Sequence, residues 1–121
     1  MKKIEAFIRH EAFDAIRDRL AGMGLPSMSI AEVKGSGRQA GITESYRGAK
    51  AKIFLRPKLK LEMVVDDDDV DRAVETILEL AHTGDPGDGK IFILPVDDAI
   101  RVRTGERGAV VLAPHPEEAT A

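Results

Sequence analysis

The strict alternation of residues 53–63 is the feature that most constrains the fold of this chain. Apolar side chains share one face: Leu55, Pro57, Leu59, Leu61 and Met63. Charged side chains share the other: Arg56, Lys58, Lys60 and Glu62. Successive side chains point to opposite faces of a β-strand, so this pattern predicts a strand with one apolar and one polar face. The proline indicates that its start lies at a sheet edge or opens into a loop.

Hydrophobic periodicity predicts further elements on both sides of this strand. The expected strands are 3–9, 27–33 and 91–96, with a short extended piece at 99–103, and the expected helices are 13–23 and 70–81. The order is therefore strand, helix, strand, long loop, strand, helix, strand. Two β-α-β halves predict an α+β, ferredoxin-like βαββαβ sandwich, with an antiparallel four-stranded sheet and both helices on one face. Another copy of the chain is a reasonable cover for the open face.

Two stretches beside these elements need separate explanations. Residues 34–52 are rich in glycine and charge and have little to bury, so they predict a long exposed loop between strands two and three. Residues 66–69 are four consecutive aspartates. They lack the spacing of a calcium loop, and we expect them to cap the helix that follows.

Composition excludes several classes of function. The net charge of −3 is wrong for a protein that coats nucleic acid or anionic membrane. The chain has no cysteine, which excludes disulfides, thiol catalysis and zinc–thiolate sites and suits a reducing cytoplasm. No apolar run reaches the roughly 20 residues of a membrane span. We expect a cytoplasmic protein without direct membrane insertion.

The stretch HTGDPGDGKIFILP, residues 82–95, contains the only P-loop-like pattern. Gly84 to Lys90 fits G-x-x-x-x-G-K, but Ile91 replaces the required hydroxyl. A helix precedes the turn and a strand follows it, which is the reverse of a P-loop. Two interpretations stay open: an ordinary helix end with a tight turn, or a glycine nest that binds an anion beside a lysine.

Other positive groups favour the second interpretation. Arg101 and Arg103 share a face if their segment is extended, and arginine pairs well with phosphate oxygens. Lys58 lies on the polar face of the third strand, and glycines and Arg38 open the long loop. Together these groups are sufficient to line one polyphosphate site.

Five stretches resemble the nitrogen regulatory protein PII family: KGSGRQAG (34–41), TESYRGAK (43–50), RPKLKLEMVV (56–65), TGDPGDGKIFILPV (83–96) and IRVRTGE (100–106). The resemblance covers residues 1–107, which we interpret as one domain with its effector loop at about 36–54, followed by a flexible tail over 108–121. It implies a non-enzymatic homotrimer with nucleotide sites between subunits. Such proteins bind ATP or ADP competitively, bind 2-oxoglutarate together with Mg²⁺ and ATP, and regulate an ammonium transporter or an enzyme of nitrogen metabolism.

The resemblance also implies roles for individual residues. Nucleotide binding is implied for Ser29, Gly35, Gly37, Arg38, Gln39, Val64, Gly87, Asp88, Gly89, Lys90, Arg101 and Arg103. Ser29 and Val64 would lie near the adenine, and the two C-terminal arginines would cross the interface to the phosphates. The implied 2-oxoglutarate residues are Gln39, Gly41, Lys58 and Gly87, with Gln39 also a ligand of Mg²⁺. The implied contacts to a target are Tyr46, Arg47, Lys50 and Lys52.

One departure from the family pattern is informative. Many relatives carry a tyrosine that is nucleotidylylated at the position of Ala51. Ala49 likewise lacks the hydroxyl that some relatives phosphorylate. We therefore expect control by ligands alone.

Other functions remain to be distinguished. A PII-like nucleotide sensor of another pathway, such as carbon metabolism, is one alternative. A weak nucleotide hydrolase is another, with Asp88 and Glu62 as candidate bases. An RNA-binding sheet would need stacking aromatic residues, and the chain has only four Phe, one Tyr and no Trp.

Overall fold

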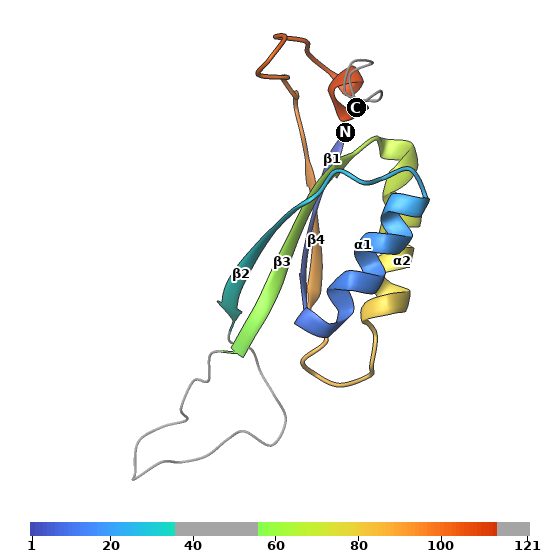
Figure 1. Cartoon of the computed structure of the whole chain (residues 1–121), viewed down its shortest axis with the longest axis vertical. Helices are drawn as coiled ribbons and strands as arrows, with labels where there is room; N and C mark the ends of the chain where they lie inside the picture. Colours follow the sequence, from blue (N-terminus) through green and yellow to red (C-terminus); the bar gives the residue numbers. More distant parts are fainter. Residues whose placement is uncertain (36–55, 114–121) are drawn as a thin grey trace.

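A computed structural model describes residues 1–35 and 56–113 and shows a sheet backed by two helices (Figure 1). The strands are β1 (Lys2–Ile8), β2 (Ser29–Gly35), β3 (Arg56–Val65) and β4 (Lys90–Pro95). The helices are α1 (Phe13–Gly22) and α2 (Val70–Ala81). The predicted α+β, ferredoxin-like βαββαβ fold is thus confirmed.

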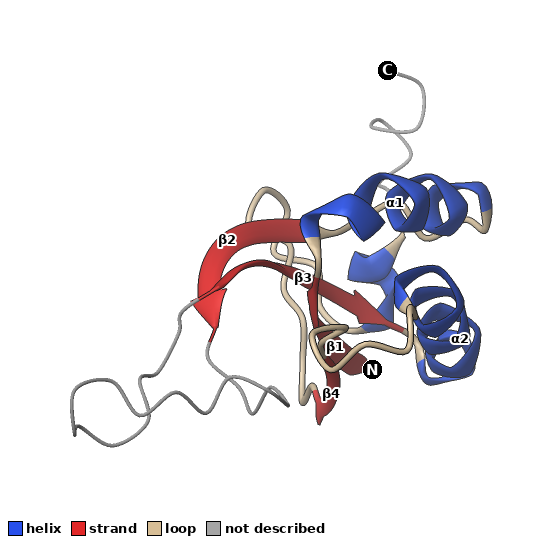
Figure 2. Cartoon of the chain, turned by 90° about the horizontal axis from the view of Figure 1, so that it is seen from below, coloured by secondary structure: helices blue, strands red, loops and turns tan. Residues whose placement is uncertain are grey.

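The sheet has the order β2-β3-β1-β4, and every neighbouring pair is antiparallel. Both helices cover the same face of this sheet, as the view in Figure 2 shows. The other face is not covered by any described element. The two central strands are therefore flanked on both sides, whereas β2 and β4 are edge strands whose outer backbone groups can meet another chain.

The core lies between the sheet and the helices. Alternate residues of β1 and β3 enter it, as the sequence pattern predicts, and the periodic apolar residues of the helices meet them. The fully buried large side chains are Ile4, Ile8, Ile16, Leu20, Leu61 and Ile77. The opposite, open face of β1 and β3 carries charged side chains paired with one another, including Lys3 with Glu62 at 3.4 Å.

The acidic run before α2 does not cap the helix in the predicted way. Residues Asp67–Asp69 form a short 3-10 helix, and Asp69 at the N-cap makes no side-chain hydrogen bond to the helix amides. Its carboxylate instead accepts from Arg72 at 2.7 Å, and Asp67 pairs with the amino group of Met1 at 3.0 Å. Charge pairing replaces capping because a 3-10 turn already precedes the helix.

Residues 97–113 form a segment that extends beyond the sheet, at the top of Figure 1. The extended piece predicted over 99–103 is not a strand, since only one isolated bridge joins Ile100 and Arg107. A 3-10 turn, η3 (Ala109–Leu112), ends the described part of the segment. The flexible tail was predicted over 108–121; of it, residues 114–121 lie outside the described residues.

Candidate functional site

The glycine-rich turn joins the end of α2 to the start of β4 at residues 82–89. Helix precedes turn and strand follows it, so the P-loop interpretation is excluded by the order of elements. Gly84 and Gly89 have φ values of 93° and 109°, which only glycine adopts readily. A Cβ on Gly89 would lie 1.7 Å from the carbonyl oxygen of Phe7, so the turn approaches β1 at a distance that no side chain allows.

Asp88 organises the inside of this turn. Its Oδ2 accepts hydrogen bonds from the main-chain amides of Thr83 and Gly84, each at 2.8 Å, and its Oδ1 accepts one from the Thr83 hydroxyl. Arg9 Nε lies 3.4 Å from the same Oδ1. The hydrogen bond from the Thr83 hydroxyl, followed by the bonds from the amides, holds the pKa of Asp88 well below its usual value.

Lys58 and Arg9 connect the turn to the sheet. Lys58, on the open face of β3, donates a hydrogen bond to the carbonyl oxygen of Gly87. A Cβ on Gly87 would lie 2.8 Å from Arg9 Nη2, so that guanidinium packs directly against the turn. Burial, then the charges of Arg9 and Arg56, lower the pKa of Lys58. This crowding of cations would be relieved by an anionic ligand.

Gly35, at the end of β2, lies close to Lys58 and the glycine turn. A Cβ on Gly35 would lie 3.8 Å from Lys58 Cγ, which is ordinary van der Waals contact. Gly35 is paired with Arg56, so the ends of β2 and β3 that flank residues 36–55 lie beside the glycine turn. We call this end of the sheet, with Arg9, Gly35, Lys58 and residues 82–90, the basic end.

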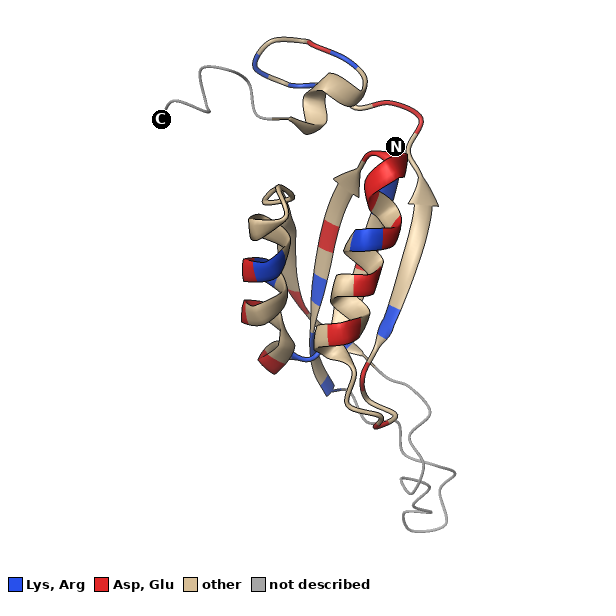
Figure 3. Ribbon diagram, turned by 90° about the vertical axis from the view of Figure 1, so that its right-hand side faces the viewer, with Lys and Arg blue, Asp and Glu red and all other residues tan. Residues whose placement is uncertain are grey.

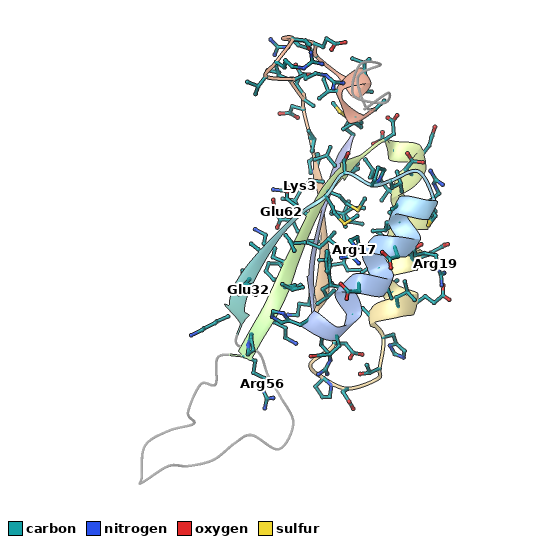
Figure 4. All side chains as sticks on the ribbon, in the orientation of Figure 1. Lys3, Arg17, Arg19, Glu32, Arg56 and Glu62 are labelled. Carbon is teal, nitrogen blue, oxygen red and sulfur yellow. The ribbon has the colours of Figure 1, made fainter. Side chains whose placement is uncertain are left out.

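Ser29 and Val64 lie toward the opposite end of the sheet. Ser29 at the start of β2 is paired with Glu62, and Val64 lies two residues further along β3, so all three share the open face. In Figure 4 Glu62 and Lys3 lie far up the sheet from Arg56, which marks the basic end.

Arg101 and Arg103 also lie beyond this opposite end, in the segment that follows β4. Figure 3 shows that segment with its mixed charges at the end of the sheet away from the glycine turn. Arg101 is largely buried there: its Nη2 donates to the carbonyl oxygen of Ala113 at 2.9 Å, and its Nε lies 3.2 Å from Glu106. Arg103 is exposed. We call the group of Ser29, Val64 and residues 97–113 the distal end.

The two ends are well separated within one copy of the chain. Lys58 and Val64 are six residues apart on the same strand. A rise of about 3.3 Å per residue places them about 20 Å apart.

The remaining predicted site residues lie outside the described part of the chain. They are Gly37, Arg38, Gln39, Gly41, Tyr46, Arg47, Lys50 and Lys52, together with the substituted positions Ala49 and Ala51. Their assignments stay predictions.

Sequence reasoning missed two residues of the basic end, Arg9 and Thr83. The signal for Arg9 was weak but present, since it is the last residue of the predicted first strand. An antiparallel pairing that sets Phe7 opposite Lys90 necessarily carries Arg9 to the glycine turn. Thr83 lies in the quoted turn, and its position five residues before Asp88 allows the two side chains to close a ring.

A groove of about 390 Å³ runs along the helix side of β4. Its lining is mostly apolar and includes Val74, Leu78, Ile91 and Ile93. At one end it reaches the glycine turn, where His82, Asp88, Gly89 and Lys90 complete the lining, so only that end offers polar groups to an anion. Within residues 1–35 and 56–113, no three His, Asp or Glu side chains gather in a way that would hold a metal ion.

Fold and site together define a small ferredoxin-like α+β domain whose glycine turn lies at one basic end, beside the strand ends that flank residues 36–55. The family model for nitrogen regulatory protein P-II matches residues 1–106, and the chain belongs to that family. It is 55% identical over 108 residues to nitrogen regulatory protein P-II 2 of Methanothermobacter thermautotrophicus, covering 89% of this chain and 94% of the relative. It is 53% identical to nitrogen regulatory protein P-II of Haemophilus influenzae, covering 88% and 95%. It is 48% identical to nitrogen regulatory protein P-II of Azospirillum brasilense, covering 89% and 96%.

These matches support a signalling role in nitrogen regulation. The relatives are named as regulatory proteins and not as enzymes. Among the described residues, no helix is long and apolar enough to span a membrane.

Proposed function

We propose that this chain is a non-enzymatic sensor of ATP, ADP and 2-oxoglutarate that acts as a homotrimer. Its nucleotide sites lie between copies. The loop between β2 and β3 transmits the bound state to a target in nitrogen metabolism, such as a transporter or an enzyme. Because Ala51 cannot be nucleotidylylated, ligands alone control this loop. The cytoplasmic location expected from the sequence is part of this proposal.

The separation of the basic and distal ends is the observation that carries the proposal. Groups suited to phosphate gather at the basic end, and the residues expected near adenine, with both C-terminal arginines, lie toward the distal end, with Val64 about 20 Å along β3 from Lys58. Two copies bring the two sets to one nucleotide if the distal end of one meets the basic end of the next. A repeated contact of this kind forms a ring when its rotation closes.

Exposed apolar side chains support such a contact. Phe92 on the open face of β4 is 49% exposed, and in the distal segment Ile100 is 53% and Val102 is 98% exposed. Apolar groups gathered on an edge strand and on a protruding segment are typical of surfaces that another protein covers.

At the assembled site, main-chain amides and cationic side chains would both bind the phosphates. Hydrogen bonds within residues 82–88 use the amides of Thr83, Gly84, Asp85 and Asp88. Gly87 and Gly89 lie outside that set, and we assign their amides to the phosphates together with Lys90. Backbone amides and a lysine at a glycine-rich turn are suited to anions. Gly35 lies beside them.

The 2-oxoglutarate site would share this end of the sheet. Lys58 would pair with one carboxylate, whereas Gln39 would ligate Mg²⁺ bound to ATP and the oxoacid. An amide oxygen is a fair magnesium ligand when the phosphates supply the charge. Gly41 and Gly87 would supply backbone contacts. A dianion bound at the root of the loop gives that loop a differential contact, which a ligand-driven switch requires.

Subunit mixing tests the shared site. Lys90→Ala damages only the basic end, and Arg103→Ala damages only the distal end. Arg103 is chosen because Arg101 also holds its own segment together. Each variant alone is expected to lose most ATP binding in calorimetry. Co-refolded in equal amounts, they should regain binding at about a quarter of the interfaces, where an undamaged basic end meets an undamaged distal end.

The same samples separate the parts of the proposal. The refolded wild type and the double variant Lys90→Ala/Arg103→Ala serve as controls for full and absent recovery. No recovery in the mixture would place the whole site in one chain and contradict the shared interface. In the wild type, 2-oxoglutarate is expected to bind only after Mg²⁺ and ATP. Equal binding without nucleotide would contradict the coupled oxoacid site.

A further inference from the structure

The acidic residue at the centre of the glycine turn is unexpected in a phosphate site. A carboxylate facing a triphosphate would repel it unless a metal ion lay between them. In this structure the Asp88 side chain is turned into the turn and is only 21% exposed. Both of its oxygens are occupied by groups of the protein.

Three hydrogen-bond donors and an arginine from the described residues surround this carboxylate. The amides of Thr83 and Gly84 lie 2.8 Å from Oδ2, and the Thr83 hydroxyl donates to Oδ1. Arg9 Nε lies 3.4 Å from Oδ1 and offsets the negative charge. The imidazole of His82 lies 3.8 Å from Oδ2 at the rim. These contacts tie the end of α2 to the middle of the turn.

The same contacts determine where the turn points. Gly84 has a φ of 93°, and its amide is held by Asp88. Arg9, which follows β1, packs against Gly87 and pairs with Asp88. Lys58, on β3, donates a hydrogen bond to the Gly87 carbonyl oxygen. The side chain of Asp88 is thus the link that fixes residues 83–88 before the chain enters β4.

We propose that Asp88 is a positioning residue of the nucleotide site and contacts neither phosphate nor Mg²⁺. It holds the turn in the shape that directs the amides of Gly87 and Gly89 and the Lys90 side chain toward one anion. This inference rests on the proposed function and replaces the direct nucleotide contact that the family resemblance implies for Asp88.

Substitution of Asp88 separates positioning from contact. Asp88→Ala removes every hydrogen bond of the side chain, whereas Asp88→Asn keeps one acceptor oxygen for the amides of Thr83 or Gly84. Hydrogen bonds to a charged group are stronger than those between neutral groups, so the shape of the turn depends on them. We expect Asp88→Ala to weaken ATP binding about tenfold or more, and Asp88→Asn to weaken it less.

The control is Asp85→Asn, which removes one negative charge from the same exposed turn. We expect its ATP affinity to equal or slightly exceed that of the wild type, because only the charge changes. Every titration is made in Mg²⁺ and again in EDTA. A positioning residue gives the same fold-loss in both, whereas a metal contact gives a loss confined to Mg²⁺.

Amide spectra supply a readout that general loss of stability would not give. In ¹⁵N-labelled protein without nucleotide, Asp88→Ala should shift the amide signals of Thr83 and Gly84 and leave those of Ile4 and Leu61 unchanged. Wild-type ATP affinity in Asp88→Ala, a loss confined to Mg²⁺, or unmoved Thr83 and Gly84 signals would each overturn the positioning role. A wild type that binds no adenine nucleotide would instead contradict the proposed function. The amide shifts would still test whether Asp88 holds the turn.

Discussion

At the scale of single residues, Gly89 and Asp88 perform opposite tasks in one turn. Gly89 allows the backbone to approach β1, because its missing side chain leaves room for the carbonyl oxygen of Phe7. Asp88 fills the inside of the turn with a carboxylate that local donors satisfy. A turn shaped from both sides in this way can hold its free amides in place without a helix dipole.

Gly89→Ala is expected to destabilise the fold. The new Cβ would lie 1.7 Å from the Phe7 carbonyl oxygen, at a φ of 109°, so either the turn or β1 must move. A strained backbone of this kind costs roughly 1–3 kcal/mol, and the clash adds to it. Urea unfolding at a fixed protomer concentration measures the loss.

Gly22→Ala is the matched control for that substitution. Gly22 lies at the end of α1, and a Cβ there would have no atom within 4 Å. The free energy of unfolding of the Gly22→Ala variant should be unchanged or raised by roughly 0.5 kcal/mol, because alanine favours helix. If both variants unfold at the wild-type urea concentration, the close approach of the turn to β1 is not a constraint.

Residue roles were only partly predictable from the sequence. Alternation in β3 correctly placed Lys58 on the open face, because side-chain direction follows from local backbone geometry. The inward orientation of Asp88 was not predictable from the G-x-x-x-x-G-K pattern. Besides the local donors Thr83 and Gly84, it involves Arg9, which is distant in sequence and arrives through the pairing of β1 with β4.

At the scale of elements, the segment after β4 is organised by its own side chains. Asp98 accepts hydrogen bonds from the amides of Ala99 at 2.8 Å and Gly108 at 3.1 Å, and it pairs with Arg107 at 2.8 Å. Arg101 donates hydrogen bonds to the carbonyl oxygens of Val110 and Ala113, at the C-terminal end of the segment. The segment is therefore shaped by contacts within one copy of the chain.

Asp98→Ala is expected to loosen this segment and leave the sandwich intact. The amide of Gly108 loses its carboxylate acceptor, so its hydrogen exchange should accelerate, while the amides of β1 and β3 keep their protection. Asp97→Ala is the matched control, since Asp97 is the exposed neighbouring aspartate. Equal exchange at Gly108 in the two variants would show that Asp98 does not hold the segment.

Helix α2 shows what the sequence predicts well and what it does not. Its bounds, 70–81, agree with the apolar spacing, because a strong 3.6-residue period reflects one buried face. The start of β2 was expected two residues early, since the ends of a strand depend on its partners, and residues 53–55 of the predicted third strand lie outside the described residues. The side-chain cap was wrong because Arg72 and the amino terminus compete for the aspartates.

At the scale of the whole molecule, the topology places the expected nucleotide ligands at two ends. The sequence predicted the fold class, since the order of elements and the hydrophobic faces are local properties. It did not provide the register, which sets Ser29 opposite Glu62 and Phe7 opposite Lys90. Register arises from long-range packing, and only with it does the separation of the basic and distal ends become visible.

Acid is expected to destabilise the molecule through four carboxyl groups. The pKa of Glu62 is lowered by its bond from Lys60, that of Asp67 by the amino terminus, that of Asp88 by Thr83 and that of Asp98 by Arg107. Each folded pKa lies below the unfolded value of about 4, so the unfolded chain binds more protons between the two values. The stability from these groups is present above about pH 4 and is lost as the pH falls through the folded pKa values.

Urea unfolding between about pH 7 and pH 2.5, at one protomer concentration, measures this dependence. We expect little change in the contribution of these groups down to about pH 5 and a falling midpoint below it. Asp67→Asn should make the urea midpoint fall less steeply with acid, since one of the four groups no longer titrates. Asp66→Asn, at the exposed neighbouring aspartate, is the control and should leave this pH dependence as in the wild type. Lys3, whose pKa is raised by Glu5 and Glu62, titrates on the alkaline side and does not affect the acid limb. A midpoint that rises on acidification would show that these carboxylates are not stabilised by folding.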